Sequence, residues 1–367
     1  MSDLRRTALY DEHRALGAHV VPFGGFEMPV RYGSILREHA AVRERVGLFD
    51  LSHMAQYALR GAGVGAWADA LTVNHVATMR PKQARYNIFT NDAGGCLDDV
   101  LFYRVDDGDD WLLVVNAANA SKMWPYLLAC TEGYDVAVAS HHGTRALVAV
   151  QGPRAVDVVA PLCDLDVAAM PYYSCARARC HGVPTLIART GYTGEDGFEL
   201  FVDGGAAVAL WRTLLDRGRA FGIEPAALGA RDVLRLEAGM PLYGHELDET
   251  ISPLAGGQRW AVKMTKPAFR GRDALAAELA DDTYDRIAGL VLEGRVPARE
   301  GYAVFANGAR VGTVRSGSMA PSLGNKNVAT ALVGKDASVV GTTLEIEVRG
   351  VRHGATVVPL PFYKRPT

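Results

Sequence analysis

A glycine-rich turn that leads into a strand occupies residues 189–200 and reads Arg189-Thr190-Gly191-Tyr192-Thr193-Gly194-Glu195-Asp196-Gly197-Phe198-Glu199-Leu200. Its glycines allow sharp turns and a close approach of the backbone to a ligand. It is not a phosphate loop, because no Gly-Lys-Ser/Thr follows and the run enters a strand instead of a helix. Glu199 faces away from its two apolar neighbours, so its carboxylate can accept two donors from an amidine-like ring edge. An exposed glutamate on a surface turn explains the same pattern.

The segments on both sides of this turn predict an α+β fold. Helical spacing of apolar residues predicts helices over residues 35–46, 206–221 and 229–238, the last stopped by Gly239 and Pro241. Short β-rich runs predict strands at 86–89, 100–105, 111–115, 146–151 and 184–189, with a hairpin tip at 106–109. After about residue 275, runs at 287–293, 302–305, 310–315, 343–348 and 354–358 predict a small C-terminal β-barrel or sandwich. There Asn307-Gly308 is typical of a hairpin turn.

Bulk composition excludes several classes of protein. Lys and Arg total 39 against 41 Asp and Glu, so the net charge of -2 does not suggest a nucleic-acid-binding protein. No apolar run reaches the length of a membrane span, and no signal peptide is expected. The five cysteines, an odd count without CxxC spacing, argue against a disulfide framework and a zinc ribbon. We therefore expect a protein of a reducing compartment, the cytoplasm.

A second motif with chemical potential is the pair Asp98-Asp99, which follows the turn Gly94-Gly95 and begins a strand. Alternation puts the two carboxylates on opposite faces, so they need not share a role. One side chain can cap the turn, while an inward carboxylate can accept or steer the proton of a bound amine. A solvated turn is the ordinary explanation of such a pair.

A third motif, Gly229-Ala230-Arg231-Asp232-Val233-Leu234-Arg235-Leu236-Glu237, places Arg231 and Arg235 four residues apart on one helical face. Arg231 can hold a carboxylate or position a catalytic acid, although a structural salt bridge is the commoner role of such an arginine. His53 is expected to be hydrogen-bonded scaffolding. The run 245–249 lacks His-Glu-x-x-His spacing, so we predict no metal site.

Together these motifs resemble one family, the glycine cleavage T-proteins, over about residues 9–365. The resemblance rests on the blocks that begin at Arg189 and at Gly229 and on six shorter motifs: Pro22-Phe23-Gly24-Gly25-Phe26-Glu27-Met28-Pro29, Asp50-Leu51-Ser52-His53-Met54, Val115-Asn116-Ala117-Ala118-Asn119, Val150-Gln151-Gly152-Pro153, Met240-Pro241-Leu242-Tyr243-Gly244-His245-Glu246 and Leu360-Pro361-Phe362-Tyr363-Lys364-Arg365. It implies a three-domain cloverleaf around a central folate channel. The expected domains are 1–50 with 141–255 (split α+β, folate-binding), 51–140 (second α+β) and 280–367 (C-terminal β-barrel).

The resemblance also implies the reaction and its residues. The family is a tetrahydrofolate-dependent aminomethyltransferase of the glycine cleavage system, which acts with the lipoylated H-protein. Tetrahydrofolate is the expected co-substrate, with no metal and no flavin, and no nucleic-acid or membrane partner is expected. By position, the essential aspartate of the family falls on Asp99. The residues matching those around the folate are Met54, Tyr86, Asn116, Tyr192, Glu199 and Arg231.

Two rival functions share this fold. A folate-linked demethylase module, as in sarcosine or dimethylglycine oxidases, is fused to a flavin domain, for which this chain has no Gly-rich dinucleotide segment. A folate-binding assembly factor for iron–sulfur proteins carries a Lys-Gly-Cys-Tyr-x-Gly-Gln-Glu motif, where this chain has residues 240–246 of different sequence. Departures from the family at 315–323 and 258–260 leave the reaction class unchanged and affect the expected channel detail and partner docking.

Overall fold

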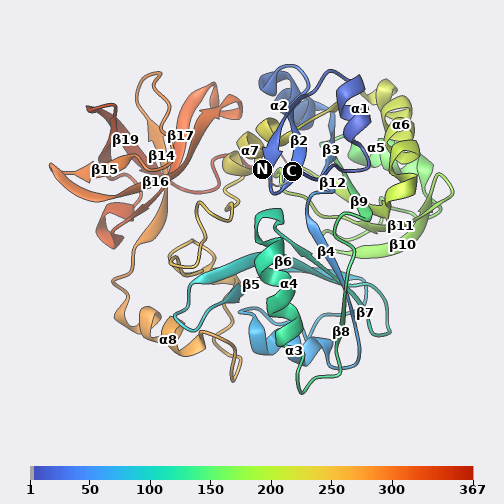
Figure 1. Cartoon of the computed structure of the whole chain (residues 1–367). Helices are drawn as coiled ribbons and strands as arrows, with labels where there is room; N and C mark the ends of the chain where they lie inside the picture. Colours follow the sequence, from blue (N-terminus) through green and yellow to red (C-terminus); the bar gives the residue numbers. More distant parts are fainter. Residues whose placement is uncertain (1–3, 367) are drawn as a thin grey trace. The chain divides into compact units, whose positions relative to one another are not determined.

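The computed structural model describes residues 4–366 and has the predicted mixed α+β class (Figure 1). It separates into two compact units. One contains Met1–Ala68, Val76–Tyr86 and Val100–Asp232, and the other contains Asp69–His75, Asn87–Asp99 and Val233–Thr367. The division into three domains implied by the resemblance stays a prediction. None of the helices in the described part of the chain has the length and hydropathy needed to cross a membrane.

The first unit contains a six-stranded sheet of order β10-β11-β12-β9-β3-β13, antiparallel except for the β13–β3 pair. Its strands are β3 (Val46–Asp50), β9 (Arg145–Gln151), β10 (Cys175–Cys180), β11 (Val183–Ala188), β12 (Gly197–Asp203) and β13 (Ile223–Pro225). The apolar face of α6 (Ala207–Gly218) and the short α5 (Ala155–Val159) share one buried cluster with this sheet. Burial of that helical stripe is the main reason the predicted amphipathic helix forms.

A five-stranded sheet has the order β5-β6-β7-β4-β8. Its strands are β4 (Ala55–Arg60), β5 (Gln83–Thr90), β6 (Cys96–Arg104), β7 (Asp110–Val115) and β8 (Ala137–Ser140). In the first unit, α4 (Ala120–Ala129) contacts β4, since the ring of Trp124 stacks on that of Tyr57 at 5.3 Å. β6 and β7 pair antiparallel on either side of residues 105–109, which confirms the predicted hairpin tip.

Three short helices and a hairpin complete the N-terminal region: α1 (Tyr10–Ala15), α2 (Ile35–Glu44), α3 (Val64–Leu71), and β1 (His19–Phe23) paired with β2 (Phe26–Arg31). A buried polar network ties α1 to β3. His13 Nε2 lies 2.9 Å from Asp50 Oδ2, and the Tyr32 hydroxyl lies 2.8 Å from His13 Nδ1. Asp50 Oδ1 accepts from Ser52 N at 2.9 Å. The network therefore fixes the loop that leads to His53 and Met54.

The C-terminal region of the second unit is a closed barrel of order β14-β17-β16-β15-β18-β19 (Figure 1). Its strands are β14 (Arg286–Leu292), β15 (Ala303–Ala306), β16 (Ala309–Ala320), β17 (Lys326–Val333), β18 (Thr343–Val348) and β19 (Val351–Val358). β14 pairs with both β17 and β19, and this closes the ring. Asn307 and Gly308 have φ of 49° and 80°, which confirms the predicted hairpin turn.

Two predicted helices have slightly different bounds in the structure. The helix predicted over 35–46 ends earlier, because β3 already begins at Val46. The helix predicted over 206–221 is α6 with a 3₁₀ turn at each end, Gly204–Ala206 and Arg219–Phe221. The helix predicted over 229–238 is α7 (Leu228–Glu237), and Gly239 with φ of 67° ends it. α8 (Arg272–Asp281) had no sequence prediction.

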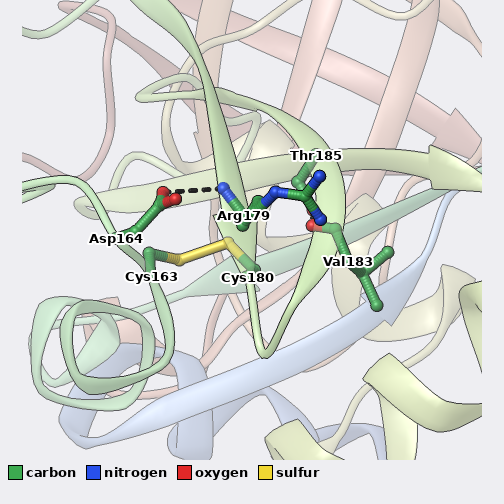
Figure 2. Close-up of a disulfide and its surroundings, with 6 residues drawn as sticks. All are labelled: Cys163, Asp164, Arg179, Cys180, Val183 and Thr185. Carbon is green, nitrogen blue, oxygen red and sulfur yellow. Dashed lines mark hydrogen bonds between the residues drawn. A yellow bond between two sulfur atoms is a disulfide. The ribbon is translucent and has the colours of Figure 1, made fainter.

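One disulfide joins Cys163 to Cys180, so the expectation that the cysteines form no disulfide is wrong for this pair. The two residues are opposite each other in a short antiparallel bridge, with Cα atoms 4.2 Å apart. Figure 2 shows Asp164 beside them, whose carboxylate accepts from Arg179 N at 2.7 Å. Spacing rules did not reveal the pair, because residues 164–179 lead away from Cys163 and return along β10, which ends at Cys180. Cys96, Cys130 and Cys175 are free thiols.

The disulfide is expected to add about 3 kcal/mol to the free energy of unfolding, since it closes a loop of roughly 15 residues in the unfolded chain. Cys163→Ser should lower the melting temperature and abolish its response to dithiothreitol, whereas Cys130→Ser should leave that response intact. Alkylation of unfolded, unreduced protein followed by mass measurement should add three labels. Five labels without reductant would show that the bond is absent.

Candidate functional site

The glycine-rich turn of residues 189–196 is a rigid loop between β11 and β12. Arg189 forms two parallel hydrogen bonds with Asp196, at 3.0 and 2.6 Å, so the two ends of the loop are joined. The Gln151 side chain donates to Thr190 O at 3.0 Å and accepts from the Thr193 hydroxyl at 3.0 Å. A Cβ at Gly191 would lie 2.0 Å from the Gln151 side-chain oxygen. A side chain at that position would therefore displace the Gln151 amide and its two hydrogen bonds to the loop.

Glu199 lies at the centre of β12 and is only 7% exposed. Two hydroxyl groups donate to its Oε2 atom, Thr190 at 2.5 Å and Tyr103 at 3.1 Å. The described contacts thus reach one oxygen of the carboxylate, and Oε1 can accept an N–H from a ligand. A buried carboxylate held in this way is suited to a polar ring edge, because its position is fixed before the ligand arrives.

Tyr192 and Arg231, two of the residues that the resemblance places around the folate, lie against each other. The guanidinium carbon of Arg231, in α7, lies 4.4 Å from the centroid of the Tyr192 ring. Such a stack fixes the planar cation and leaves its N–H groups directed outward around its edge. Both residues are half-buried, so they are partly accessible to a ligand.

Met54 and Asn116 lie at one end of the β4–β7 pair, because Ala55 is paired with Val115. The tip of the β1–β2 hairpin approaches the same place. A Cβ on Gly24 would lie 2.6 Å from the Cβ of Ala117, and the Phe23 ring meets the His53 ring edge-on at 5.4 Å. Gly24 has φ of 56°, so this close approach also uses a backbone conformation that glycine favours. Both candidates are half-buried.

The imidazole of His53 is buried and neutral at pH 7, but its Nδ1 atom has no hydrogen-bond partner in the described structure, so the hydrogen bond expected of a scaffolding histidine is not found at that atom. Burial lowers its pKa to about 4, and the positive charge of Arg231 acts in the same direction against the opposing effect of Asp50. Its backbone carbonyl accepts from His142 Nε2 at 3.2 Å. Electrostatic coupling to Arg231 places His53 in the neighbourhood of the Tyr192–Arg231 stack.

Acid should destabilise the protein through His53. In the unfolded chain the imidazole takes up its proton near pH 6.5, but the folded protein resists protonation until about pH 4. The stabilisation is therefore present above pH 6.5 and is lost as the pH falls toward 4, by about 3 kcal/mol for this group. Melting temperatures of wild type and His53→Gln across this range should converge at low pH, with the exposed His19→Gln as control. Parallel curves for wild type and His53→Gln would contradict this.

The two neighbouring aspartates of β6 lie in the second unit and differ as alternation predicts. Asp98 is fully buried and its carboxylate accepts from Asp99 N at 3.1 Å, which lies inside β6 and not at the turn. At the turn, the side-chain oxygen of Asn91 accepts from Gly95 N at 2.9 Å. Asp99 is half-buried. Alternation along β6 puts Asp99 on the same face of the strand as Leu101 and Tyr103. Tyr86 is half-buried in β5, the neighbouring strand in the sheet order.

Some polar residues of this region were missed or assigned differently from the sequence. Tyr103 and Thr190, the partners of Glu199, were not singled out, although Tyr103 follows Asp99 at strand spacing. Arg235 takes the structural role that was weighed for Arg231, since it forms a buried ion pair with Glu246 at 3.1 Å. Residues 4–366 contain no cluster of His, Cys, Asp and Glu suited to a metal ion.

The described elements define an α+β protein with a closed C-terminal barrel, and its first unit contains a buried carboxylate, Glu199, held by two hydroxyl groups. Two family models match this chain: the GCVT N-terminal domain over residues 9–266 and the glycine cleavage T-protein C-terminal barrel domain over residues 286–364. The chain is 44% identical to an aminomethyltransferase of Moorella thermoacetica, and the match covers the whole length of both proteins. It is 45% identical to one of Deinococcus deserti, over 99% of this chain and 98% of that protein.

A solved structure agrees with these relatives. The crystal structure of the glycine cleavage system aminomethyltransferase T from Bartonella henselae matches with a TM-score of 0.92 and 33% identity, over 99% of both chains. The chain belongs to the glycine cleavage T-protein family. This confirms the resemblance found in the sequence motifs.

Proposed function

We propose that this protein is the aminomethyltransferase of a glycine cleavage system. It transfers the methylene carbon of the aminomethyl group, carried on the lipoyl arm of H-protein, to tetrahydrofolate. Ammonia leaves, the lipoyl sulfur takes a proton to become a thiol, and the carbon bridges two folate nitrogens that each lose a hydrogen. The observation that carries the proposal is the full-length match to relatives named aminomethyltransferase, together with the buried Glu199 carboxylate.

The residues of the first unit fit a reduced pterin. Glu199 offers a carboxylate oxygen to an amino group and a ring N–H, which a ring without these donors would leave unpaired. Arg231, stacked on Tyr192, offers N–H groups to a carbonyl or carboxylate. Met54 and Asn116, at the end of β4 and β7, supply an apolar and an amide contact. Tyr86 contributes a further aromatic surface from β5.

Asp99 is proposed as the working carboxylate of the reaction. Its role is to orient the attacking folate nitrogen and to take or steer the proton which that nitrogen loses. Asp98 accepts a backbone N–H and is fully buried, so the mechanism uses one carboxylate and not an acid–base pair. We further propose the three-domain division implied by the family and a cytoplasmic location. The cysteine pattern no longer supports that location, because Cys163 and Cys180 form a disulfide.

The direct test incubates the purified protein with tetrahydrofolate and aminomethylated lipoyl H-protein and measures ammonia release and methylene-tetrahydrofolate formation. Both products should appear in equal amounts and should depend on both substrates. Failure of the wild-type protein to release ammonia would overturn the proposed function. Formation of the folate product from sarcosine or dimethylglycine instead would favour the demethylase reaction.

Glu199→Gln should raise the KM for tetrahydrofolate about 10- to 100-fold, since a hydrogen bond to a charged group contributes about 1.5–3 kcal/mol. The amide keeps the volume of the side chain but replaces one acceptor oxygen by a donor. The exposed Glu44→Gln is the control and should leave KM unchanged. Steady-state kinetics at saturating H-protein measure both. An unchanged KM for Glu199→Gln would remove this residue from the folate site.

A further inference from the structure

The backbone just before Asp99 is held by a separate segment of the second unit, residues 242–251. Cys96 N donates to Asp248 O at 2.9 Å and to Ile251 O at 3.1 Å. On the other side of the same residue, the Tyr243 hydroxyl donates to Cys96 O at 3.0 Å. Both polar groups of the Cys96 backbone are therefore bonded to this segment, three residues before Asp99.

The turn before Cys96 is fitted to the same segment. A Cβ on Gly95 would lie 1.9 Å from Glu249 O, so only glycine allows this approach. The side chain of Asn91 bonds to both sides of this contact. Its Nδ2 atom donates to Glu249 O at 2.9 Å, and its Oδ1 atom accepts from Gly95 N at 2.9 Å. The start of β6 is thus fixed by backbone and side-chain contacts on more than one side.

The segment is anchored in turn to barrel strand β16. Arg315 donates to His245 O and to Asp248 Oδ2, the latter at 2.9 Å, and its own carbonyl accepts from His245 Nδ1 at 3.0 Å. Arg315 therefore connects the segment to the barrel through both its side chain and its backbone carbonyl. A continuous path of hydrogen bonds runs from the barrel through the segment to the strand that carries Asp99.

We propose that Tyr243 is a positioning residue for Asp99 and that Arg315 anchors its segment to the barrel. The inference rests on the proposed role of Asp99. Tyr243 does not touch the substrates. It holds the Cys96 peptide, and the short length of strand between Cys96 and Asp99 transmits that position to the carboxylate. A reacting group displaced by about 1 Å can lose about 100-fold in rate, so a single lost contact is expected to be measurable.

Burial and the nearby carboxylate of Asp98 raise the pKa of the Tyr243 phenol well above its usual value. The hydroxyl therefore keeps its proton over the working pH range and remains a donor to Cys96 O. Tyr243→Phe removes this one donor and preserves the ring. Tyr243→Phe should lower kcat about tenfold. It should change the KM for tetrahydrofolate by less than twofold, because Tyr243 holds only the strand of Asp99 and the other proposed folate ligands lie in other segments.

The decisive experiment is a double-mutant cycle on the full chain, with Tyr243→Phe, Asp99→Asn and the two combined. If Tyr243 acts through Asp99, Tyr243→Phe should cause no further loss in the Asp99→Asn background. Tyr302→Phe, a half-buried barrel tyrosine outside the segment, is the control and should keep full kcat. Arg315→Met removes the side-chain bonds of the barrel anchor to His245 O and Asp248 and keeps the backbone bond to His245. It should lower kcat about threefold and should have no further effect in the Asp99→Asn background.

The outcomes separate this inference from the proposed function. Full kcat in Tyr243→Phe, or an equal loss with and without Asp99→Asn, overturns the positioning role. Full activity in Asp99→Asn overturns the role of Asp99 itself. If Tyr243→Phe fails to fold, Arg315→Met carries the same cycle, and a loss equal in both backgrounds overturns the inference.

Discussion

Asp99→Asn is expected to lower kcat about 1,000-fold, within the range of 10²–10⁴ that general acid–base catalysis contributes. Asparagine keeps the size of the side chain and a carbonyl oxygen, so the folate still fits, but the amide cannot take the proton of the attacking nitrogen. The KM for tetrahydrofolate should change little. Rapid-quench measurement of methylene-tetrahydrofolate with aminomethylated H-protein would separate the chemical step from product release.

Asp98→Asn is the matched control, because the two residues are adjacent but lie on opposite faces of β6. Asp98 is fully buried and its carboxylate accepts a hydrogen bond from Asp99 N at 3.1 Å. The side-chain carbonyl oxygen of an asparagine can accept the same hydrogen bond. Its kcat should remain within a few-fold of wild type. If Asp98→Asn lost as much activity as Asp99→Asn, the assignment of a single working carboxylate would be wrong.

Local elements of the fold were predictable where one physical rule decides the structure. The stripe of Trp211 and Leu214 marked α6, and Asn307-Gly308 marked the β15–β16 hairpin, because helix amphipathicity and positive φ are local properties. Strand β17 was missed. Its centre, Val328 to Leu332, is uniformly small or apolar, so no alternation distinguishes a strand from other buried segments.

The site was predictable only in part. Motifs singled out Glu199, Tyr192 and Arg231 as candidates, but not the hydroxyl of Tyr103 that donates to Glu199 from 96 residues away. The bonds that hold the start of β6 also join distant parts of the chain, such as Tyr243 and Cys96. No spacing rule reports such pairs, because they depend on how sheets and loops pack and not on the period of one element.

The two departures from the family have structural explanations within the second unit. Arg315 bonds to the backbone of His245 and to Asp248, as described above. Gln258 accepts from the indole N–H of Trp260 at 3.0 Å. The Arg315 bonds join distant parts of the chain and the Gln258 bond is local, and neither involves a proposed ligand of the folate.

Glu246→Gln is expected to cause the largest loss of stability. Glu246 and Arg235 are each 2% exposed and form an ion pair at 3.1 Å, and the Thr330 hydroxyl and Leu242 N donate to the same carboxylate. Removing one charge leaves Arg235 buried without its counter-ion, which typically costs about 3–5 kcal/mol. At about 2 °C per kcal/mol for a chain of this size, the melting temperature should fall by roughly 6–10 °C.

The pH dependence gives this prediction a second readout. Burial alone would raise the pKa of Glu246, but Arg235 and the hydrogen-bond donors outweigh it and hold the pKa below its usual value. The stabilisation is therefore present above the unfolded pKa of about 4.3 and is lost as the pH falls through the lower folded value. The difference in melting temperature between wild type and Glu246→Gln should be largest near pH 7 and shrink below pH 4.

Glu345→Gln provides the comparison, because its pair with Arg352 is largely exposed and is expected to contribute about 0–1 kcal/mol. A loss of stability in Glu246→Gln no larger than that in Glu345→Gln would show that the buried pair does not stabilise the second unit.

The Glu246→Gln variant is also expected to affect activity. Glu246 lies within residues 242–251, so a folded Glu246→Gln protein at low temperature should lose kcat as Tyr243→Phe does, through the same segment that holds the strand of Asp99.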